Sequence, residues 1–387
     1  MTLAASPHLT AESDLAERDL RLRRLRESLA AADADTLLAY GPAWRRENVR
    51  YLVNAPIRGD ASFALLSADG TITAFSSRDS DLPRLRAAGW VDDAHLIGAA
   101  LSQLVSRLRD IAPRRLAIAQ MELVPESVMA TLRGALAPRT DIISGTAQME
   151  HVRLTKSPWE IERHRAAARV CDLGWKRFVE VLEPGLPEYH ITAEVEACLK
   201  IAGAEDNFML MASGGDQVRG MVPPGNRRLA EHDLVRTELT PQLGGYWTQI
   251  CRSAVVGAPT DAQKASFDLF SQALQAGLDA LHAGVTCHEV ARAENQVFER
   301  QGFGEYCGSS WTRVRGHNLG THLDESPVAE GNHTVLPAGA VLIVHPNTFT
   351  PLAGYHVLGE PVVVTETGYE RLLSTDVRLF SSKENAA

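Results

Sequence analysis

Hydrophobic positions recur at two different spacings along the chain, and the order of these spacings predicts alternating strands and helices. After a polar arm that leads into a helix, short apolar runs separated by turn residues occupy residues 36–77. Asp69-Gly70 lies between two such runs and is typical of a β-hairpin. Helical spacing follows at residues 99–111. This pattern predicts a smaller N-terminal α/β domain over residues 1–150.

The rest of the chain has longer helical patterns and predicts a second domain over residues 151–387. Ser157-Pro158, followed by acidic residues, is typical of a helix start. Strand patterns dominate residues 208–256, two more helices follow, and the end of the chain from Val314 is again rich in strand patterns. We therefore expect helices that wrap a bent antiparallel sheet.

Composition narrows the class of protein. The 387 residues suit two domains with separate cores, and 22% charged and 45% hydrophobic residues are ordinary for a globular protein. A net charge of −9 argues against a nucleic-acid partner, since phosphate binding needs a basic face. No apolar run approaches the roughly 20 residues of a membrane span, and no signal peptide is recognisable. Five widely spaced cysteines without a CxxC pair are typical of free thiols, so we expect a cytoplasmic protein without membrane contact.

Several motifs occur in an order that resembles a known family. The central motif is a strand, a Gly-Gly-Tyr turn and a second strand over residues 234–257. It is accompanied by Glu183-Pro184-Gly185, by Arg315-Gly316-His317 with Gly320 and Pro327, and by the closing segment VVVTETGYERL. Together these motifs resemble the pita-bread family, which includes methionine aminopeptidase, aminopeptidase P and creatinase. The resemblance implies a C-terminal pita-bread domain, an N-terminal creatinase-like α/β domain, a small-molecule substrate and a homodimer.

The resemblance also marks positions where this chain departs from the metallopeptidases of the family. Two aspartates of the family's dimetal centre correspond to Glu238 and Gln249, and the metal histidine is kept as His317. The family's other site positions hold Met221, Asp324 (with His322 nearby), His345, and Leu358 or Gly359 with Glu360 next along. Two dications need several carboxylates to screen their repulsion, so these exchanges predict that the pair of metals is absent.

Two interpretations of the metal chemistry stay open at this stage. Either no metal is bound, or a single Zn, Fe or Mn ion is held by Gln249, His317, His345 and Glu360. His345 follows an apolar strand, so a buried structural histidine is an equal alternative for it.

The resemblance gives a set of candidate site residues. The catalytic candidates are Glu238, which would activate water, His317, which would carry the proton, and His345. A structural ion pair with Arg236 or Arg252 is the alternative role for Glu238. The substrate-binding candidates are Gln249, Arg315, Tyr246, Trp247, Glu325 and Arg58.

These residues predict an enzyme that acts on a small polar metabolite. The leading hypothesis is hydrolysis of a non-peptide C–N bond in the manner of creatinase or ectoine hydrolase. The alternatives are a mononuclear metal-dependent lyase or oxygen-using enzyme, and a catalytically inactive binding module. Because the dimetal ligands are exchanged, Xaa-Pro dipeptides are predicted not to be turned over.

Overall fold

The computed structural model describes residues 11–382, which divide into two compact units. The first unit ends at Leu154 and the second begins at Thr155. Among the helices of residues 11–382, none has the length and apolar character needed to cross a membrane. The predicted two-domain α/β architecture is confirmed.

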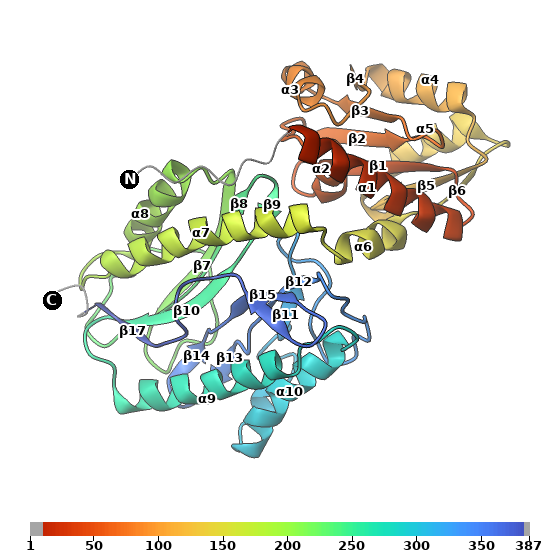
Figure 1. Cartoon of the computed structure of the whole chain (residues 1–387). Coiled ribbons are helices and arrows are strands. Elements are labelled where there is room, and N and C mark those ends of the chain that lie inside the picture. Colours follow the sequence, from red (N-terminus) through yellow and green to blue (C-terminus); the bar gives the residue numbers. More distant parts are fainter. Residues whose placement is uncertain (1–10, 383–387) are drawn as a thin grey trace. The chain divides into compact units, whose positions relative to one another are not determined.

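A mixed six-stranded sheet forms the centre of the first unit, within its described residues (Figure 1). The hairpin predicted at Asp69-Gly70 joins two antiparallel strands of this sheet, and Gly70 adopts a φ of +92°, which a residue without Cβ does readily. In spatial order the strands are β4 (Asp93–Leu96), β3 (Ile72–Ser76), β2 (Ala61–Leu66), β1 (Thr36–Pro42), β5 (Arg115–Ala119) and β6 (Asp141–Ser144).

Helices bury both faces of this sheet. Leu37 and Ala39 of β1 belong to one apolar cluster, and Leu38 and Tyr40 belong to another, because successive side chains of a strand point to opposite faces. The first cluster includes residues of α1 (Ala11–Ala31), α2 (Glu47–Val53), α3 (Leu82–Ala87) and α6 (Thr146–Leu154). The second includes residues of α4 (Ser102–Ile111) and α5 (Glu126–Leu136). Short 3₁₀ turns occur at Asp79–Asp81, Ala99–Leu101 and Met121–Leu123.

The second unit is built on two sheets that meet at a bridge between Cys251 and Gly359. The first sheet contains, in order, β17 (Phe380–Ser381), β10 (Ile250–Val255), β8 (Leu234–Leu243) and β7 (Asp206–Gly214), with β9 (Tyr246–Trp247) paired to β8. The second contains β11 (Gly316–Asn318), β12 (Val341–Val344), β15 (Glu360–Val364) and β16 (Tyr369–Arg371). A separate hairpin is formed by β13 (Thr348–Thr350) and β14 (Gly354–His356).

Helices pack on both sides of these strands, as Figure 1 shows for α7 on one side and for α9 and α10 on the other. The predicted start at Ser157 is correct: its side chain accepts a hydrogen bond from the Glu160 backbone, and the Glu160 side chain accepts one from the Ser157 backbone. The same reciprocal cap begins α9 at Thr260 and α10 at Thr286. The bounds are α7 (Pro158–Glu180), α8 (Glu188–Ile201), α9 (Asp261–Asp279), α10 (Cys287–Arg300) and a 3₁₀ turn at Gly304–Cys307.

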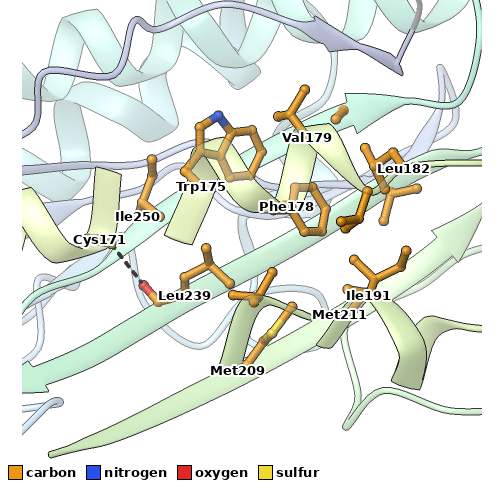
Figure 2. Packing of buried hydrophobic residues seen from close by; sticks show 14 of the residues in the cluster. Cys171, Trp175, Phe178, Val179, Leu182, Ile191, Met209, Met211, Leu239 and Ile250 are labelled. Carbon is orange, nitrogen blue, oxygen red and sulfur yellow. Dashed lines mark hydrogen bonds between the residues drawn. The ribbon is translucent and has the colours of Figure 1, made fainter. Parts of the chain in front are cut away.

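The apolar side of α7 packs on the first sheet (Figure 2). Trp175 and Phe178 stack with ring centroids 4.9 Å apart, in the same buried cluster as Leu239 of β8 and Ile250 of β10. Leu239 directly follows Glu238, and successive side chains of a strand face opposite sides. The helix therefore covers one face of β8, and Glu238 points away from this core.

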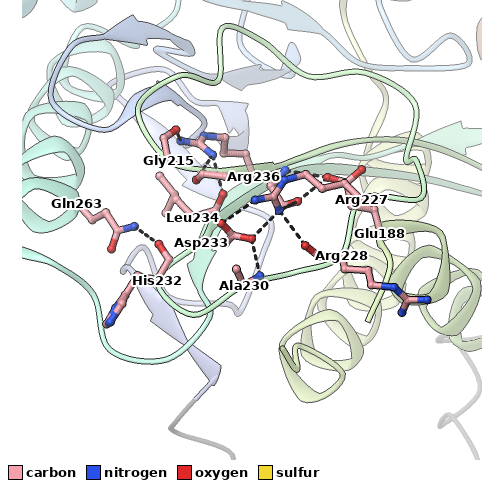
Figure 3. Close-up of polar contacts among 12 residues, drawn as sticks. Glu188, Gly215, Arg227, Arg228, Ala230, His232, Asp233, Leu234, Arg236 and Gln263 are labelled. Atoms are coloured by element: carbon pink, nitrogen blue, oxygen red, sulfur yellow. Dashed lines mark hydrogen bonds and ion pairs between the residues drawn. The ribbon is translucent and has the colours of Figure 1, made fainter. Parts of the chain in front are cut away.

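Arg236 ties β8 to the segments around it (Figure 3). Its side chain is fully buried, and this burial lowers its pKa to about 9. All five of its N–H donors are used by backbone carbonyl groups, which belong to Gly214, Gly215, Leu234, Ala353 and Tyr355. One guanidinium group thus connects the start of β8 to the end of β7 and to the β13–β14 hairpin.

A second polar network holds the segment between β7 and β8 (Figure 3). Arg227 and Asp233 form an ion pair at 2.6 Å. Glu188 of α8 accepts a hydrogen bond from the Gly225 backbone at 3.0 Å. Since Met221 lies on this segment, the network also fixes the backbone that carries Met221.

Candidate functional site

A cleft of about 340 Å³ opens in the second unit, and residues from both of its sheets line it. The structure brings together Glu238, Gln249, His317 and His345 in this lining, although they are far apart in the sequence. The volume falls at the lower end of the roughly 300–1,000 Å³ range of small-molecule pockets. The cleft is therefore the candidate functional site.

Glu238 belongs to a row of hydrogen-bonded side chains in the cleft, which also contains Asn347, Cys251 and Gln249. Asn347 Nδ2 donates to Glu238 Oε1 at 2.8 Å, Cys251 Sγ donates to the same oxygen at 3.5 Å, and Gln249 Nε2 donates to Cys251 Sγ at 3.2 Å. Burial raises the pKa of Glu238 to about 7, and the hydrogen bonds from Cys251 and Asn347 oppose this only in part. A carboxyl group with this pKa can accept or donate a proton near neutral pH.

Two neutral histidines form another part of the lining. The rings of His317 and His345 have their centroids 5.5 Å apart. Burial lowers the pKa of both; the charge of Asp324 opposes this at His317, and the neighbouring His317 adds to it at His345. His317 Nδ1 donates to the carbonyl oxygen of Asn318 at 3.3 Å, because a carbonyl can only accept. The Nε2 atom of His317 is therefore the hydrogen-bond acceptor.

Gly316 allows the two histidines to approach. Its φ is +143°, and a Cβ at this position would lie 2.2 Å from the carbonyl oxygen of Ile343. The absence of a side chain lets β11 pair closely with β12, with His317 opposite Ile343. This register places His317 beside His345, just beyond the end of β12.

A further part of the lining is apolar. It includes Phe208 and Leu210 of β7, Met221 and Tyr355. Leu210 lies directly opposite Glu238 in the β7–β8 register, so the apolar surface begins beside the carboxyl group. Phe208 is 44% exposed at the edge of the cleft. A ligand can therefore place apolar groups here while it contacts polar groups on the other strands.

Two family models match the chain. The model of the Creatinase/Prolidase N-terminal domain matches residues 21–155, and that of metallopeptidase family M24 matches residues 162–366. The chain belongs to metallopeptidase family M24. The two family models confirm the predicted relationship to the creatinase and aminopeptidase P group, and solved structures of that group share the fold.

Members of M24 with similar sequences carry peptidase names. The chain is 24% identical to the uncharacterised peptidase YqhT of Bacillus subtilis over 355 residues. The alignment covers 90% of this chain and 96% of that protein. It is 27% identical to an Xaa-Pro dipeptidase of Pyrococcus furiosus over 238 residues. This alignment covers 60% of this chain and 66% of that protein. The structure of an Xaa-Pro dipeptidase from Bacillus anthracis superimposes with a TM-score of 0.81 at 22% identity, over 94% of this chain and 99% of that one.

These names correct the functional prediction. They describe enzymes of peptide hydrolysis, and several further M24 relatives are named dipeptidases. The hypothesis of a hydrolase for non-peptide C–N bonds is therefore wrong, as are the alternatives of a lyase, an oxygen-using enzyme or an inactive binding module. The prediction that the chain is not a peptidase fails with it.

The name of the M24 family implies divalent metal ions, and the lining can be compared with that requirement. Glu360, a predicted ligand, is fully buried outside the lining, where it accepts a hydrogen bond from Arg252 at 2.6 Å. At Gly359 a Cβ would lie 2.8 Å from the Cβ of His345 and 3.0 Å from that of Cys251, so no side chain fits there. Among residues 11–382 no group of three or more His, Cys, Asp or Glu side chains is placed to hold a metal ion.

Two candidate substrate-binding residues have structural partners instead of a place in the lining. Arg315 is buried and donates to the side chain of Asn295 and to the carbonyl oxygen of Asn347. Tyr246 is buried and donates through its hydroxyl group to Glu160 at 2.9 Å. Arg315 therefore helps to hold the backbone of Asn347, which lines the cleft, and Tyr246 helps to hold α7 through Glu160.

The other candidates also lie outside the lining. The backbone of Trp247 donates to the carbonyl oxygen of Gly320, and Glu325 forms an ion pair with Lys156 at 3.2 Å. Arg58 belongs to the first unit and is exposed there. Of the substrate-binding candidates, Gln249 is the one that lines the cleft.

Sequence reasoning missed Asn347 and Arg313. Asn347 lines the cleft and orients Glu238, and it lies two positions after His345. The alternation of a strand would have suggested the same face for both residues. Arg313 also lines the cleft, but no sequence signal distinguishes it from an ordinary surface arginine.

Proposed function

We propose that this chain hydrolyses short peptides, with Xaa-Pro dipeptides as the first class to test. The observation that carries the proposal is Glu238, which lines a cleft of about 340 Å³ together with Gln249, His317 and His345. The Xaa-Pro dipeptidase of Pyrococcus furiosus and the probable dipeptidase PepE of Mycobacterium tuberculosis support the substrate class. A homodimer, expected from the family resemblance, and a cytoplasmic location, predicted from the widely spaced cysteines, complete the proposal.

Glu238 is the proton carrier in this proposal. Its carboxylate, oriented by Asn347, removes a proton from a water molecule while the water oxygen adds to the scissile carbonyl carbon. The carboxyl group then gives this proton to the leaving nitrogen as the C–N bond breaks. The Nε2 acceptor of His317 can hold the second hydrogen of the water.

We infer that the chain is a divergent M24 member in which these steps are performed by its own side chains. The two positions of the family's metal aspartates hold one carboxylate, Glu238, and one neutral amide, Gln249. Glu360 is neutralised by Arg252, and Gly359 leaves no space for a ligand. This residue set does not fit a pair of dications, which need several carboxylates to screen their repulsion.

The proposal is tested by the release of free proline from Leu-Pro, Phe-Pro and Gly-Pro. The wild-type chain, the Glu238→Gln variant and the control variant Glu366→Gln are compared. Glu366 serves as the control because it is exposed and does not line the cleft. General acid–base catalysis contributes about 10²–10⁴-fold, so Glu238→Gln should lower kcat by about 100-fold or more. Glu366→Gln should leave kcat unchanged.

Each reaction is run after chelation and again with added Mn²⁺. Proline release that is independent of both treatments and depends on Glu238 supports the proposal. Proline release that requires Mn²⁺ and survives Glu238→Gln would contradict the assigned chemistry. The absence of release from all three dipeptides by correctly folded protein would overturn the function itself.

A further inference from the structure

One ion pair lies on the lining of the cleft. Arg313 Nη2 and Asp324 Oδ2 are 2.7 Å apart, and both residues line the cleft together with Glu238. The Arg313 side chain is 67% exposed and that of Asp324 is 28% exposed, so the pair faces solvent at the cleft. Among the charged Asp, Glu, Lys and Arg side chains of the described lining, these two and Glu238 are the complete set.

The pair is electrostatically linked to the centre of the site. Burial is the main cause of the shifted pKa values of Glu238 and His317, and the charges of Arg313 and Asp324 act on both groups in opposite directions. Such linkage requires that the pair lie near both groups. A molecule that reaches Glu238 therefore also comes within range of a separate positive and a separate negative charge.

Opening this ion pair costs little free energy. Exposed pairs of this kind contribute little to stability, because water competes for both groups. A molecule that carries one ammonium and one carboxylate group can replace both partners at once, since Asp324 then binds the ammonium and Arg313 the carboxylate. Arginine suits this role because its planar guanidinium matches the two oxygens of a carboxylate.

The apolar lining defines the rest of such a ligand. Phe208, Leu210 and Met221 offer apolar surface, and Leu210 lies directly opposite Glu238 in the sheet register. A free amino acid would use the two charges but would bring no peptide bond to Glu238. A dipeptide with an apolar residue brings the charges, the peptide bond and the apolar side chain together.

We propose that Arg313 and Asp324 select unblocked dipeptides by exchanging their mutual ion pair for the two charged ends of the ligand. This inference rests on the proposed function for the identity of the reacting bond. It goes beyond that function by assigning the recognition of both peptide ends to two residues outside the row that contains Glu238.

The test uses four peptides that differ only at their ends: Leu-Pro, acetyl-Leu-Pro, Leu-Pro-amide and acetyl-Leu-Pro-amide. Their affinities are measured calorimetrically with the full chain carrying Glu238→Gln, so that hydrolysis is slow during the titration. Blocking either end should weaken binding about tenfold, and blocking both ends should weaken it further. Hydrolysis by the wild-type chain is measured separately.

Two additional substitutions assign the ends. Asp324→Asn should remove the penalty of acetylation while leaving that of amidation, and Arg313→Gln should remove the penalty of amidation while leaving that of acetylation. Arg292→Gln serves as the control, because it breaks a partly exposed ion pair with Glu299 on α10 and Arg292 does not line the cleft. It should leave all four affinities unchanged.

The outcomes separate this inference from the proposed function. Equal affinities for the four peptides would overturn the inference. An Arg313→Gln variant that weakens the binding of all four equally would also overturn it, because the ion pair would then have only a structural role. A chain that discriminates the peptide ends without releasing proline would refute hydrolysis and keep the inference. A chain that binds none of the four peptides would overturn both.

Discussion

The shifted ionisation of Glu238 leads to a pH-dependent stability that one substitution should remove. Burial raises its pKa from 4.5 to about 7 in the folded chain. A group whose pKa is raised by folding stabilises the protein fully below its unfolded pKa, and this contribution is lost as pH rises through the folded value. The stability that depends on Glu238 should therefore fall between about pH 4.5 and pH 7.

The size of this effect follows from the shift. One pKa unit corresponds to about 1.4 kcal/mol, so the full shift corresponds to about 3 kcal/mol. Glu238 is only half-buried at the cleft, and water there screens its charge. We therefore expect Glu238→Gln to gain about 1–2 kcal/mol relative to the wild type between pH 5 and pH 8. Glutamine keeps an oxygen that can accept the hydrogen bond from Asn347.

The free energy of unfolding is measured by urea denaturation at pH 5, 6, 7 and 8 for the wild type, Glu238→Gln and the exposed control Glu366→Gln. The wild type is subtracted at each pH, which removes the titration of all other groups. The difference for Glu238→Gln should rise with pH, and that for Glu366→Gln should stay flat. A Glu238→Gln difference that is the same at pH 5 and pH 8 would refute the raised pKa.

Three other perturbations test the surroundings of the cleft. Arg236→Lys has three donors in place of five and leaves buried carbonyls unpaired, so urea denaturation should show a loss of about 2–5 kcal/mol; a loss below 1 kcal/mol would contradict the network. Glu360→Leu leaves the buried charge of Arg252 uncompensated and should lower the free energy of unfolding by about 3–5 kcal/mol. The double variant Glu360→Leu/Arg252→Met should lower it much less, and additive losses would argue against the ion pair. Burial lowers the pKa of His345, so its contribution to stability is present above pH 6.5 and is lost as pH falls. His345→Gln should therefore lose less stability than the wild type between about pH 7 and pH 5. Parallel profiles of unfolding free energy against pH for the two proteins would contradict this.

The local patterns of the sequence were sufficient for the fold. Capping signals at Ser157 and the hairpin at Asp69-Gly70 have the predicted conformations, because caps and tight turns depend on residues only a few positions apart. The order of the motifs was sufficient to predict that Glu238 and His317 line one site, because the family fold that this order implies brings their strands together. The residue types of Glu238, Gln249 and His345 taken alone favoured a reaction other than peptide hydrolysis, whereas the relatives that share the fold carry peptidase names.

The sequence by itself determined the two-domain architecture, the family and the four polar residues that meet in the cleft. The tertiary structure decided which charges are available there. In the structure Glu360, a predicted metal ligand, forms an ion pair with Arg252, and Asn347 orients Glu238. Arg313 and Asp324 become a pair at the cleft. The physical reason is that the ionisation and the partner of a side chain depend on its burial and on atoms contributed by distant segments, and neither quantity is encoded in local spacing.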